Sequence, residues 1–245
     1  MGGYERDFLK SGWERLEGFV SDQSKGMPPP PLQKPAGEGE RVIPLPEVRH
    51  GEFAKMTLDG AMASRRSVRQ FTGEPLELAE LGWLLWATQG VWKTFREGTV
   101  AMRTVPSAGA RHPFETYLVV TAVEGLDGGL YRYLPFDHSL VLEGPHPGEA
   151  AVTAACHGQQ FCGDSAVCFF WSVIPYRTEW RYGPVSPKII ALDAGHLCQN
   201  LYLAVEEIGA GTCAIGAYDQ SASDAVIGAD GTDEFVIYIA PVGKV

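Results

Sequence analysis

The sequence predicts a domain that combines a β-sheet with two long helices. The first observation is a series of apolar, β-branched and aromatic runs bounded by turn residues, which is typical of strands. The second is the turn Asp127-Gly128-Gly129, which predicts that the first two strands pair as a hairpin, followed by a turn at 135–138 that leads to the third. The predicted strands lie at 115–123, 129–134, 139–143, 166–174 and 234–243.

The third observation is helical spacing of apolar residues over 75–90 and 187–209. Pro75 opens the first helix and Gly90 ends it. Both helices are apolar on more than one face, so we expect each to be buried within the fold or at a subunit contact. One small sheet cannot cover this much apolar surface, and the sequence therefore predicts a homodimer built on these helices.

The composition is that of an ordinary globular protein and limits the partners. The chain has 245 residues, of which 45% are hydrophobic and 20% charged, enough to bury a core without disulfides. Its formal net charge of -10 argues against nucleic acid or an anionic membrane as the main partner, because both require clustered positive charge. The odd number of cysteines, five, without a Cys-x-x-Cys pair predicts reduced, mostly buried thiols in a cytosolic protein.

Residues 1–50 are predicted to be a proline-rich extension of a domain that covers 51–245. The stretch "MPPPPLQKPAGEGE" favours an extended conformation, so we expect this segment to be partly flexible or to wrap over a surface. The first residues lack the apolar stretch of a secretory signal. Charged residues interrupt the longest apolar segment, 189–208, so we do not expect this segment to form a stable membrane-spanning helix. The expected location is the cytoplasm.

The stretch "SRRSVRQF" places three guanidinium groups and a hydroxyl within five residues of an otherwise acidic chain. A helix predicted from Phe53 reaches this stretch, which would put Arg65 and Arg69 on one face, with Arg66 a quarter-turn away and Ser67 between them. The forked guanidinium donor matches a phosphate and also stabilises negative charge on a ring. A solvated basic helix face is the alternative interpretation, and these residues alone do not separate the two.

Two further stretches are rich in small residues. In "RTVPSAGARHP" the small residues are explained either by turn chemistry or by close approach of the backbone to a flat or phosphorylated ligand. "GAGTCAIGAYD", residues 209–219, follows a helix, which disfavours a dinucleotide-binding turn. His112 is a proton donor or simply a loop residue, whereas Cys213 is expected to be a buried thiol. Asp193, His196 and Asn200 share helical spacing, but without a metal-binding motif we expect a polar patch and no metal.

Taken in order, five stretches resemble the FMN-dependent nitroreductase family, and most closely its SagB-type dehydrogenase branch, which includes the azoline oxidases of peptide natural-product biosynthesis. The resemblance covers about 56–245. Each motif alone is modestly specific, but five in the order of the family are strongly so. The stretches are "SRRSVRQF", "RTVPSAGARHP", "GLYRYLPFDHSL", "DAGHLCQNLYLAVEEIGAGTCAIGAYD" and "DEFVIYIAPVG".

The resemblance implies an α+β fold with a mainly antiparallel central sheet flanked by helices, and a homodimer with FMN at the subunit contact. It also implies ping-pong transfer of two electrons from NAD(P)H or an organic donor to a nitro compound, a quinone or a similar acceptor. By motif position, the FMN-binding residues would be Arg65, Arg66, Ser67 and Arg69 for the phosphate, ribityl chain and pyrimidine edge, Pro106, Ser107, Ala108 and Gly109 from the partner chain, and Gly216 and Ala217 near flavin N5 and O4. Arg111 and His112 are candidates for orienting the substrate.

The sequence also departs from the family pattern. Family members commonly carry a C-terminal basic residue that reaches the phosphate, and here only Lys244 is placed to supply it. The catalytic lysine and tyrosine of the azoline oxidases are not assigned, although Lys188 and Tyr182 lie in the corresponding region. Two alternatives to a nitroreductase-like enzyme stay open: an azoline dehydrogenase of peptide modification, and a flavin-binding accessory protein without turnover whose proline-rich segment docks a partner.

Overall fold

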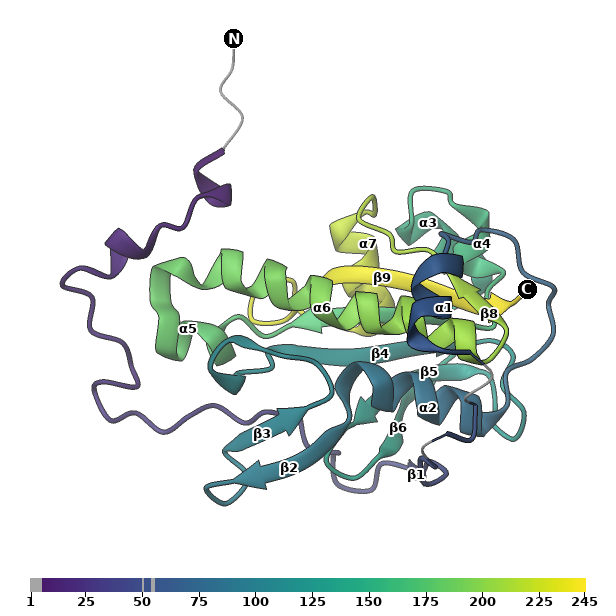
Figure 1. Cartoon of the computed structure of the whole chain (residues 1–245), viewed down its shortest axis with the longest axis horizontal. Coiled ribbons are helices and arrows are strands. Elements are labelled where there is room, and N and C mark those ends of the chain that lie inside the picture. The colour runs from purple at the N-terminus through teal and green to yellow at the C-terminus, as the bar shows by residue number, and fades with distance from the viewer. Residues whose placement is uncertain (1–5, 50, 54–55) are drawn as a thin grey trace, which may run out of the picture.

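A computed structural model describes residues 6–49, 51–53 and 56–245. Its helices and strands are interspersed along the chain, and they build one large sheet with helices on both of its faces and one separate hairpin (Figure 1). The strands are β1 (Val42–Pro44), β2 (Val91–Phe95), β3 (Val100–Arg103), β4 (Phe114–Val120), β5 (Gly129–Leu134), β6 (Ser139–Pro145), β7 (Val167–Val173), β8 (Ala210–Thr212) and β9 (Phe235–Lys244). The α-helices are α1 (Leu58–Ser64), α2 (Leu78–Gln89), α3 (Glu149–Ala155), α4 (Gln160–Gly163), α5 (Tyr176–Tyr182), α6 (Ser186–Glu207) and α7 (Gln220–Ile227), and the 3-10 turns are η1 (Arg6–Leu9), η2 (Trp13–Leu16), η3 (Ala108–Ala110) and η4 (Gly183–Val185).

The seven-stranded sheet has the order β1-β6-β5-β4-β7-β9-β8, and every neighbouring pair is antiparallel. The five strands expected from the sequence form its centre, and the predicted β4–β5 hairpin and the turn into β6 are confirmed. The prediction of a mainly antiparallel sheet flanked by helices is therefore correct. The edge strands β1 and β8 and the β2–β3 hairpin were not predicted from the sequence, because they are short or exposed.

Alternation along the central strands divides the core between the two sheet faces. In β4, Leu118 belongs to the cluster that also contains Leu84 of α2 and Leu197 of α6. Its neighbour Tyr117 points to the opposite face, where it belongs to the cluster formed with α3 and α7. The sheet is thus covered on both faces, which explains why its central strands are buried along their whole length.

Local signals fix the helix ends. The Thr57 hydroxyl accepts a hydrogen bond from the Gly60 amide and starts α1, and a capping box of Glu77 and Glu80 starts α2. The predicted helix that begins at Phe53 and reaches Arg69 is confirmed only over α1, because Thr57 caps the start of the helix and the chain becomes extended after Ser64. Residues 54 and 55 of that predicted helix lie outside the described residues.

The N-terminal segment runs along the outside of the domain before β1 joins the sheet beside β6 (Figure 1). The turns η1 and η2 contain no buried residue. Further along, Leu32 is buried, and Lys34 donates hydrogen bonds to the Tyr117 hydroxyl and to Glu234. We call residues 6–19 the arm and residues 20–46 the strap. The arm is the exposed part of the segment, and the strap is bonded into the domain.

Two observations concern the chain as a whole. The helices among the described residues include none with the length and apolar character needed to cross a bilayer. The cysteines Cys156, Cys162, Cys168, Cys198 and Cys213 are all buried free thiols, as the sequence predicts.

Candidate functional site

The basic stretch after α1 lies beside the turn that follows α6. Ser67 forms a parallel bridge with Thr212 of β8, and the Val68 amide donates a hydrogen bond to the carbonyl of the same threonine. Packing is close at this contact, since a methyl group on Gly211 would lie 2.7 Å from the Val68 Cβ. Two stretches that are about 145 residues apart in sequence are therefore neighbours in the fold.

Tyr202 of α6 joins these two stretches. Its hydroxyl is hydrogen bonded to the Ser67 hydroxyl at 3.0 Å and accepts a hydrogen bond from the Ala214 amide at 2.9 Å. The Arg65 guanidinium stacks over the Tyr202 ring, 5.1 Å from its centre. Tyr202 was not among the residues predicted from the sequence, because a tyrosine within a long apolar helix gives no local sign of this bridging position.

The three arginines of this stretch have no carboxylate partner among the described residues. Arg66 donates to the carbonyl groups of Ala63, Ser64 and Arg65 at the end of α1, so part of its bonding capacity serves the helix. Arg69 is exposed. No carboxylate of the described residues therefore neutralises this basic stretch, although the protein as a whole has a net charge of -10.

Gly216 and Ala217 continue the same surface after β8. Both are exposed, and their amide N–H groups donate to no acceptor in the described part of the chain. A methyl group on Gly216 would meet no atom within 4 Å, so the space in front of it is open. The two amides are therefore available to a ligand.

The loop from Pro106 to His112 is held against α6. The Ser107 hydroxyl donates to the Asp193 carboxylate at 2.6 Å and accepts from the His112 amide at 2.9 Å. The Ala108 amide also donates to Asp193, at 3.2 Å. Burial raises the pKa of Asp193, and these hydrogen bonds oppose that rise. The predicted polar patch at Asp193 is thus a clamp on this loop.

The backbone of the loop turns tightly. Gly109, Ala110 and His112 all have positive φ angles, of 59°, 52° and 43°. A cavity of about 350 Å³ lies between the loop and α6, lined by Pro106, Ser107, Ala108, Ile189, Leu192, Asp193 and His196. Small side chains thus leave space in front of this loop.

The side chains of Arg111 and His112 point into the protein. Each is 3% exposed. Arg111 donates from Nε to the Arg177 carbonyl and stacks over Trp180, and His112 donates from Nε2 to the Ala101 carbonyl. Burial, followed by the charge of Arg103, lowers the pKa of His112 to about 3. The imidazole is therefore neutral at physiological pH.

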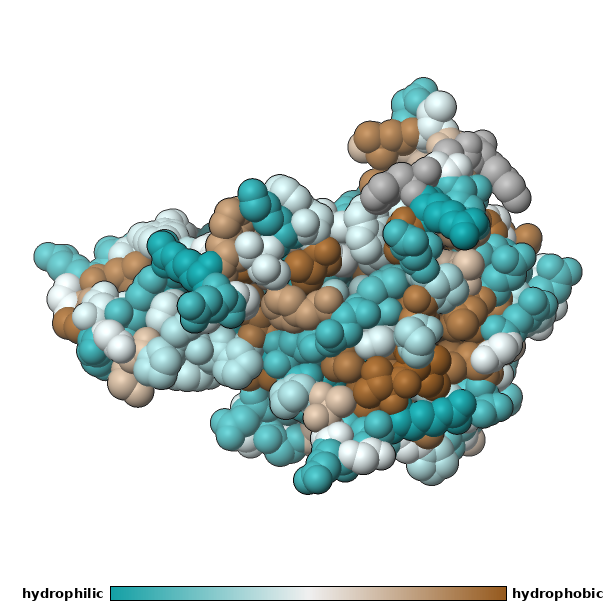
Figure 2. Space-filling model, turned by 90° about the horizontal axis from the view of Figure 1, so that it is seen from below, coloured by the Kyte–Doolittle hydropathy of each residue, from teal (hydrophilic) through white to brown (hydrophobic). Residues whose placement is uncertain are grey.

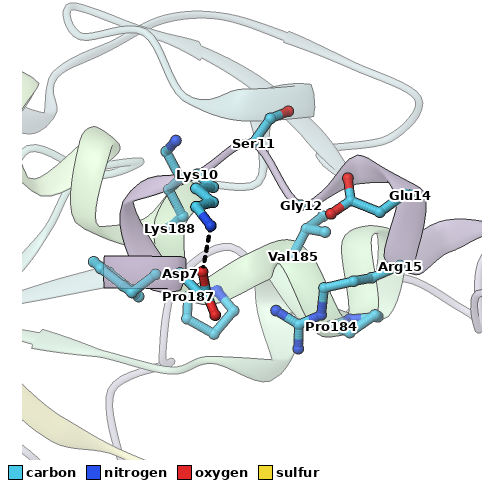
Figure 3. A pocket seen from close by; sticks show the side chains of 11 residues that line it. Asp7, Lys10, Ser11, Gly12, Glu14, Arg15, Pro184, Val185, Pro187 and Lys188 are labelled. Atoms are coloured by element: carbon cyan, nitrogen blue, oxygen red, sulfur yellow. Dashed lines mark ion pairs between the residues drawn. The ribbon is translucent and has the colours of Figure 1, made fainter. Parts of the chain in front are cut away.

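Three other residues considered in the sequence are engaged elsewhere. Lys244 pairs with Glu80 and donates to the Ile208 carbonyl at 2.7 Å at the end of α6, so its ammonium group already has partners within the chain. Lys188 donates to the Leu9 carbonyl of the arm. It lines a pocket of about 640 Å³ between the arm and the start of α6 (Figure 3). Tyr182 packs edge-on against Trp13.

Within one chain, the two groups of residues contact α6 at separate points. Ser107 and Ala108 bond to Asp193, whereas Ser67 and Ala214 bond to Tyr202, nine residues further along the helix. At 1.5 Å per residue this separation is about 13.5 Å. The predicted site residues therefore form two separate groups, which we name the arginine half-site (Arg65, Arg66, Ser67, Arg69, Gly216, Ala217) and the loop half-site (Pro106, Ser107, Ala108, Gly109) as candidates for parts of one site.

The chain belongs to the nitroreductase family. The sequence profile of the family matches residues 62–244. A relative from Methanocaldococcus jannaschii, named "Putative nitroreductase", is 31% identical over 199 residues, which are 81% of this chain and 96% of the relative. This result confirms the family assignment made from the sequence and identifies the chain as a member of a family of oxidoreductases.

Solved structures support the same fold. A protein of Ralstonia eutropha JMP134 whose structure is described as that of a nitroreductase is 27% identical, with a TM-score of 0.70 over 89% of this chain and 98% of its own length. A similar protein of Anabaena variabilis is 26% identical, with a TM-score of 0.73 over 86% of this chain. The match covers 43% of the Anabaena protein, so the present chain corresponds to less than half of that protein.

More distant structures share the fold alone. One is a chain of the Escherichia coli microcin synthetase McbBCD complex with a truncated pro-MccB17, 16% identical, with a TM-score of 0.62 over 99% of this chain and 94% of that chain. Another is an NADPH:FMN oxidoreductase of Vibrio harveyi in complex with NAD+, 15% identical, with a TM-score of 0.53 over 76% of this chain and 68% of its own length.

Proposed function

We propose that the protein is a homodimeric, FMN-dependent oxidoreductase that passes two electrons from NAD(P)H or an organic donor to a nitro compound, a quinone or a similar acceptor. The observation that carries this proposal is the arginine half-site. Its unpaired guanidinium groups match a phosphate, and the free amides of Gly216 and Ala217 match the polar edge of a flavin ring. The open space in front of Gly216 leaves room for the ring.

Each residue has a distinct role in this proposal. Arg65, Ser67 and Arg69 hold the phosphate, the ribityl chain and the pyrimidine edge, and a cation near that edge stabilises negative charge on the reduced ring. Arg66 caps α1 and adds charge. Bound FMN supplies the hydride chemistry, while the protein supplies binding, orientation and exclusion of water. Arg111 and His112, being buried, position the loop in place of direct substrate contact.

The separation of the half-sites supports a homodimer. The face of α6 between Asp193 and Tyr202 carries Gly195, His196 and Gln199, all exposed. A methyl group on Gly195 would meet no atom of the chain within 4 Å, so a second helix can approach closely. If two copies of α6 pack antiparallel about a two-fold axis midway between Asp193 and Tyr202, the loop half-site of each copy comes to the same level along the helix pair as the arginine half-site of the other.

The surface offers further area for such a contact. Leu192 on α6 is 56% exposed, and Trp92, Phe95 and Met102 of the β2–β3 hairpin are also exposed. Apolar patches interrupt the polar side chains on the lower face of the molecule (Figure 2). Exposed apolar area of this kind favours association with a second copy.

Complementation between two defective variants tests both the cofactor and the dimer. Arg69→Ala removes a phosphate donor and Ala108→Trp fills the space in front of the loop, so each homodimer should lose activity. Coexpression with two different tags gives heterodimers in which one of the two composite sites is intact. A statistical mixture should regain about a quarter of the wild-type activity. Failure to regain activity, with both variants folded, contradicts a site shared between chains.

Flavin content is the complementary measurement. Arg69→Ala should purify with less FMN and bind added FMN at least tenfold more weakly, a loss typical of one charge-assisted hydrogen bond. Arg49→Ala is the matched control, because Arg49 is an exposed arginine outside both half-sites. Wild-type protein that takes up no FMN refutes the proposal. Flavin that dithionite reduces but neither NADH nor NADPH reduces favours the alternatives below.

An azoline dehydrogenase of the SagB type is the second candidate. The observation in its favour is that the microcin synthetase chain aligns over 99% of this chain, including the N-terminal segment that precedes the family match at residue 62. Oxidation of a synthetic thiazoline peptide to the thiazole, with reduction of bound flavin, would favour this candidate. A flavin that no organic donor reduces would favour the third interpretation, an accessory protein without turnover.

A further inference from the structure

A cluster of arginines lies behind the loop half-site. Arg111 is buried, donates from Nε to the Arg177 carbonyl and leaves its Nη2 without a partner among the described residues. Burial lowers the pKa of Arg111, and the nearby charges of Arg181 and Arg177 lower it further. Arg111 is thus close enough to Arg177 and Arg181 for their charges to act on it.

Negative charge compensates only part of this cluster. Arg177 forms a buried ion pair with Glu115. Arg111 and Arg181 form no ion pair with any carboxylate of the described residues. Even with the Asp193 carboxylate bonded to Ser107 and Ala108, the two guanidinium groups without an ion pair leave an excess of positive charge beside the loop half-site, which in an acidic protein is an unusual local feature.

Arg181 is the exposed member of the cluster and lies against the loop. A methyl group on Gly109 would be 3.1 Å from the Arg181 Cδ and 3.3 Å from its Nε. The guanidinium carbon lies 5.4 Å from the centre of the Tyr182 ring, and Trp13 of the arm packs edge-on against the same ring, with 6.1 Å between the ring centres. Stacking fixes the direction of a long side chain and lowers the entropy it loses on binding.

We propose that Arg181 binds the anionic group, a carboxylate or sulfonate, of the acceptor and so determines its specificity. This inference rests on the proposed function, because the loop half-site is the part of the molecule that faces the ring of the partner's flavin. A planar guanidinium donates two parallel hydrogen bonds to a carboxylate. The buried charge of Arg111 strengthens the attraction without touching the acceptor, because its desolvated side chain is screened less than a surface charge.

Two acceptors that share a reducible nitro group but differ in net charge test the role of Arg181. The 4-nitrobenzoate anion and its methyl ester share the ring and the nitro group but differ by one negative charge. In Arg181→Gln the anion should show a KM about tenfold or more above that of wild type with little change in kcat, since one charge-assisted contact is lost. For the methyl ester, KM should stay within about twofold of wild type. Arg181→Lys should recover part of the preference, and Arg49→Gln should match wild type.

Measuring how tightly the nitrobenzoate anion binds tests the Arg181 contact without relying on activity. Calorimetric titration of the FMN-loaded protein with the nitrobenzoate anion should give a Kd that rises about tenfold in Arg181→Gln and weakens with added salt in the wild type. Equal preference for acid and ester in wild type and Arg181→Gln overturns the role of Arg181 while the proposed function stands. Loss of flavin binding, or absence of turnover with both acceptors in wild type, shows instead that the proposed function fails, and the inference fails with it.

Discussion

The Ser107 hydroxyl donates a hydrogen bond of 2.6 Å to the carboxylate of Asp193, and this contact fixes the small-residue loop to the longest helix of the protein. Asp193 is 5% exposed, so a carboxylate that is largely removed from water holds the loop in place. Because α6 also carries Tyr202, one rigid element sets the positions of both half-sites. The geometry of the proposed dimer therefore depends on this helix more than on either loop.

Removing the Asp193 carboxylate should loosen the loop. Asp193→Ala leaves the Ser107 hydroxyl and the Ala108 amide without an acceptor, and we expect the free energy of unfolding to fall by about 1–3 kcal/mol. Asp193→Asn keeps one acceptor oxygen and should lose less. Urea unfolding of both variants without FMN measures the effect. A stability of Asp193→Ala equal to that of wild type would show that the clamp is not needed for folding.

Two glycines should respond in opposite ways to the same change. A methyl group on Gly216 meets no atom within 4 Å, so Gly216→Ala should leave the stability of the FMN-free protein within about 0.5 kcal/mol of wild type. The same methyl group should weaken FMN binding. At Gly211 it would lie 2.7 Å from the Val68 Cβ, and Gly211→Ala should lower stability by about 1–3 kcal/mol.

Thermal unfolding and FMN titration of both glycine variants check this prediction. If Gly216→Ala destabilises the protein as much as Gly211→Ala, the space in front of Gly216 is filled by the protein itself. In that case Gly216 would not be a flavin contact.

The burial of His112 predicts a dependence of stability on pH. Its pKa falls from 6.5 to about 3 on folding, because burial and Arg103 disfavour the imidazolium. Between these values the unfolded chain binds a proton that the folded chain does not, so stability is lost as the pH falls below 6.5. This residue contributes a slope of about 1.4 kcal/mol per pH unit between pH 6 and 4.

His112→Asn isolates this contribution, since asparagine tolerates the positive φ of this position but does not titrate. The stability advantage of wild type over the variant should shrink by about 2–3 kcal/mol as the pH falls from 6.5 to 4.5. Urea unfolding at several pH values measures it. Parallel pH profiles for the two proteins would mean that His112 becomes protonated without unfolding.

The elements that the sequence predicts well are those with strong periodicity. Long apolar runs are buried in the central strands β4, β5 and β7 and in the helices α2 and α6. The same burial that requires the apolar residues also stabilises these elements, so the sequence pattern predicts them. The short strand β8 has no such pattern, because its three residues are placed by pairing with β9. The error at α1 has a local cause, since the chain leaves the helix at Arg65 in order to pair with β8.

The sequence indicates which residues are candidates for the site but not how the fold arranges them. Small or basic residues in "SRRSVRQF" and "RTVPSAGARHP" are visible in the sequence. The bridging role of Tyr202, the exposed position of Arg181 and the burial of Arg111 depend on contacts between segments distant in the chain. Residue type alone does not reveal such contacts: Arg111 was a candidate from the sequence and is buried, whereas the exposed Arg181 was not a candidate.

The arm and the strap should contribute very differently to stability. Removal of residues 1–19 takes away η1 and η2, which bury no residue, and should change the free energy of unfolding by less than about 1 kcal/mol. Removal of residues 1–40 deletes the Leu32 carbonyl, which accepts from Arg103, and the carbonyls of Lys34 and Pro35, which accept from Arg132. Arg103 is 6% exposed and Arg132 3% exposed, so both would be left with unpaired buried donors.

Leaving buried charged donors unpaired is costly, and we expect the longer truncation to lose about 3–5 kcal/mol relative to the shorter one. Urea unfolding of the two truncated proteins compares them directly. Arg103→Met in the longer truncation is the matched control, because Arg103 forms no ion pair among the described residues, so the substitution removes an unpaired buried charge and should recover part of the loss. Equal stability of the two truncations would mean that water replaces the strap carbonyls. Residues 20–46 would then be a covering of the domain that its core does not require.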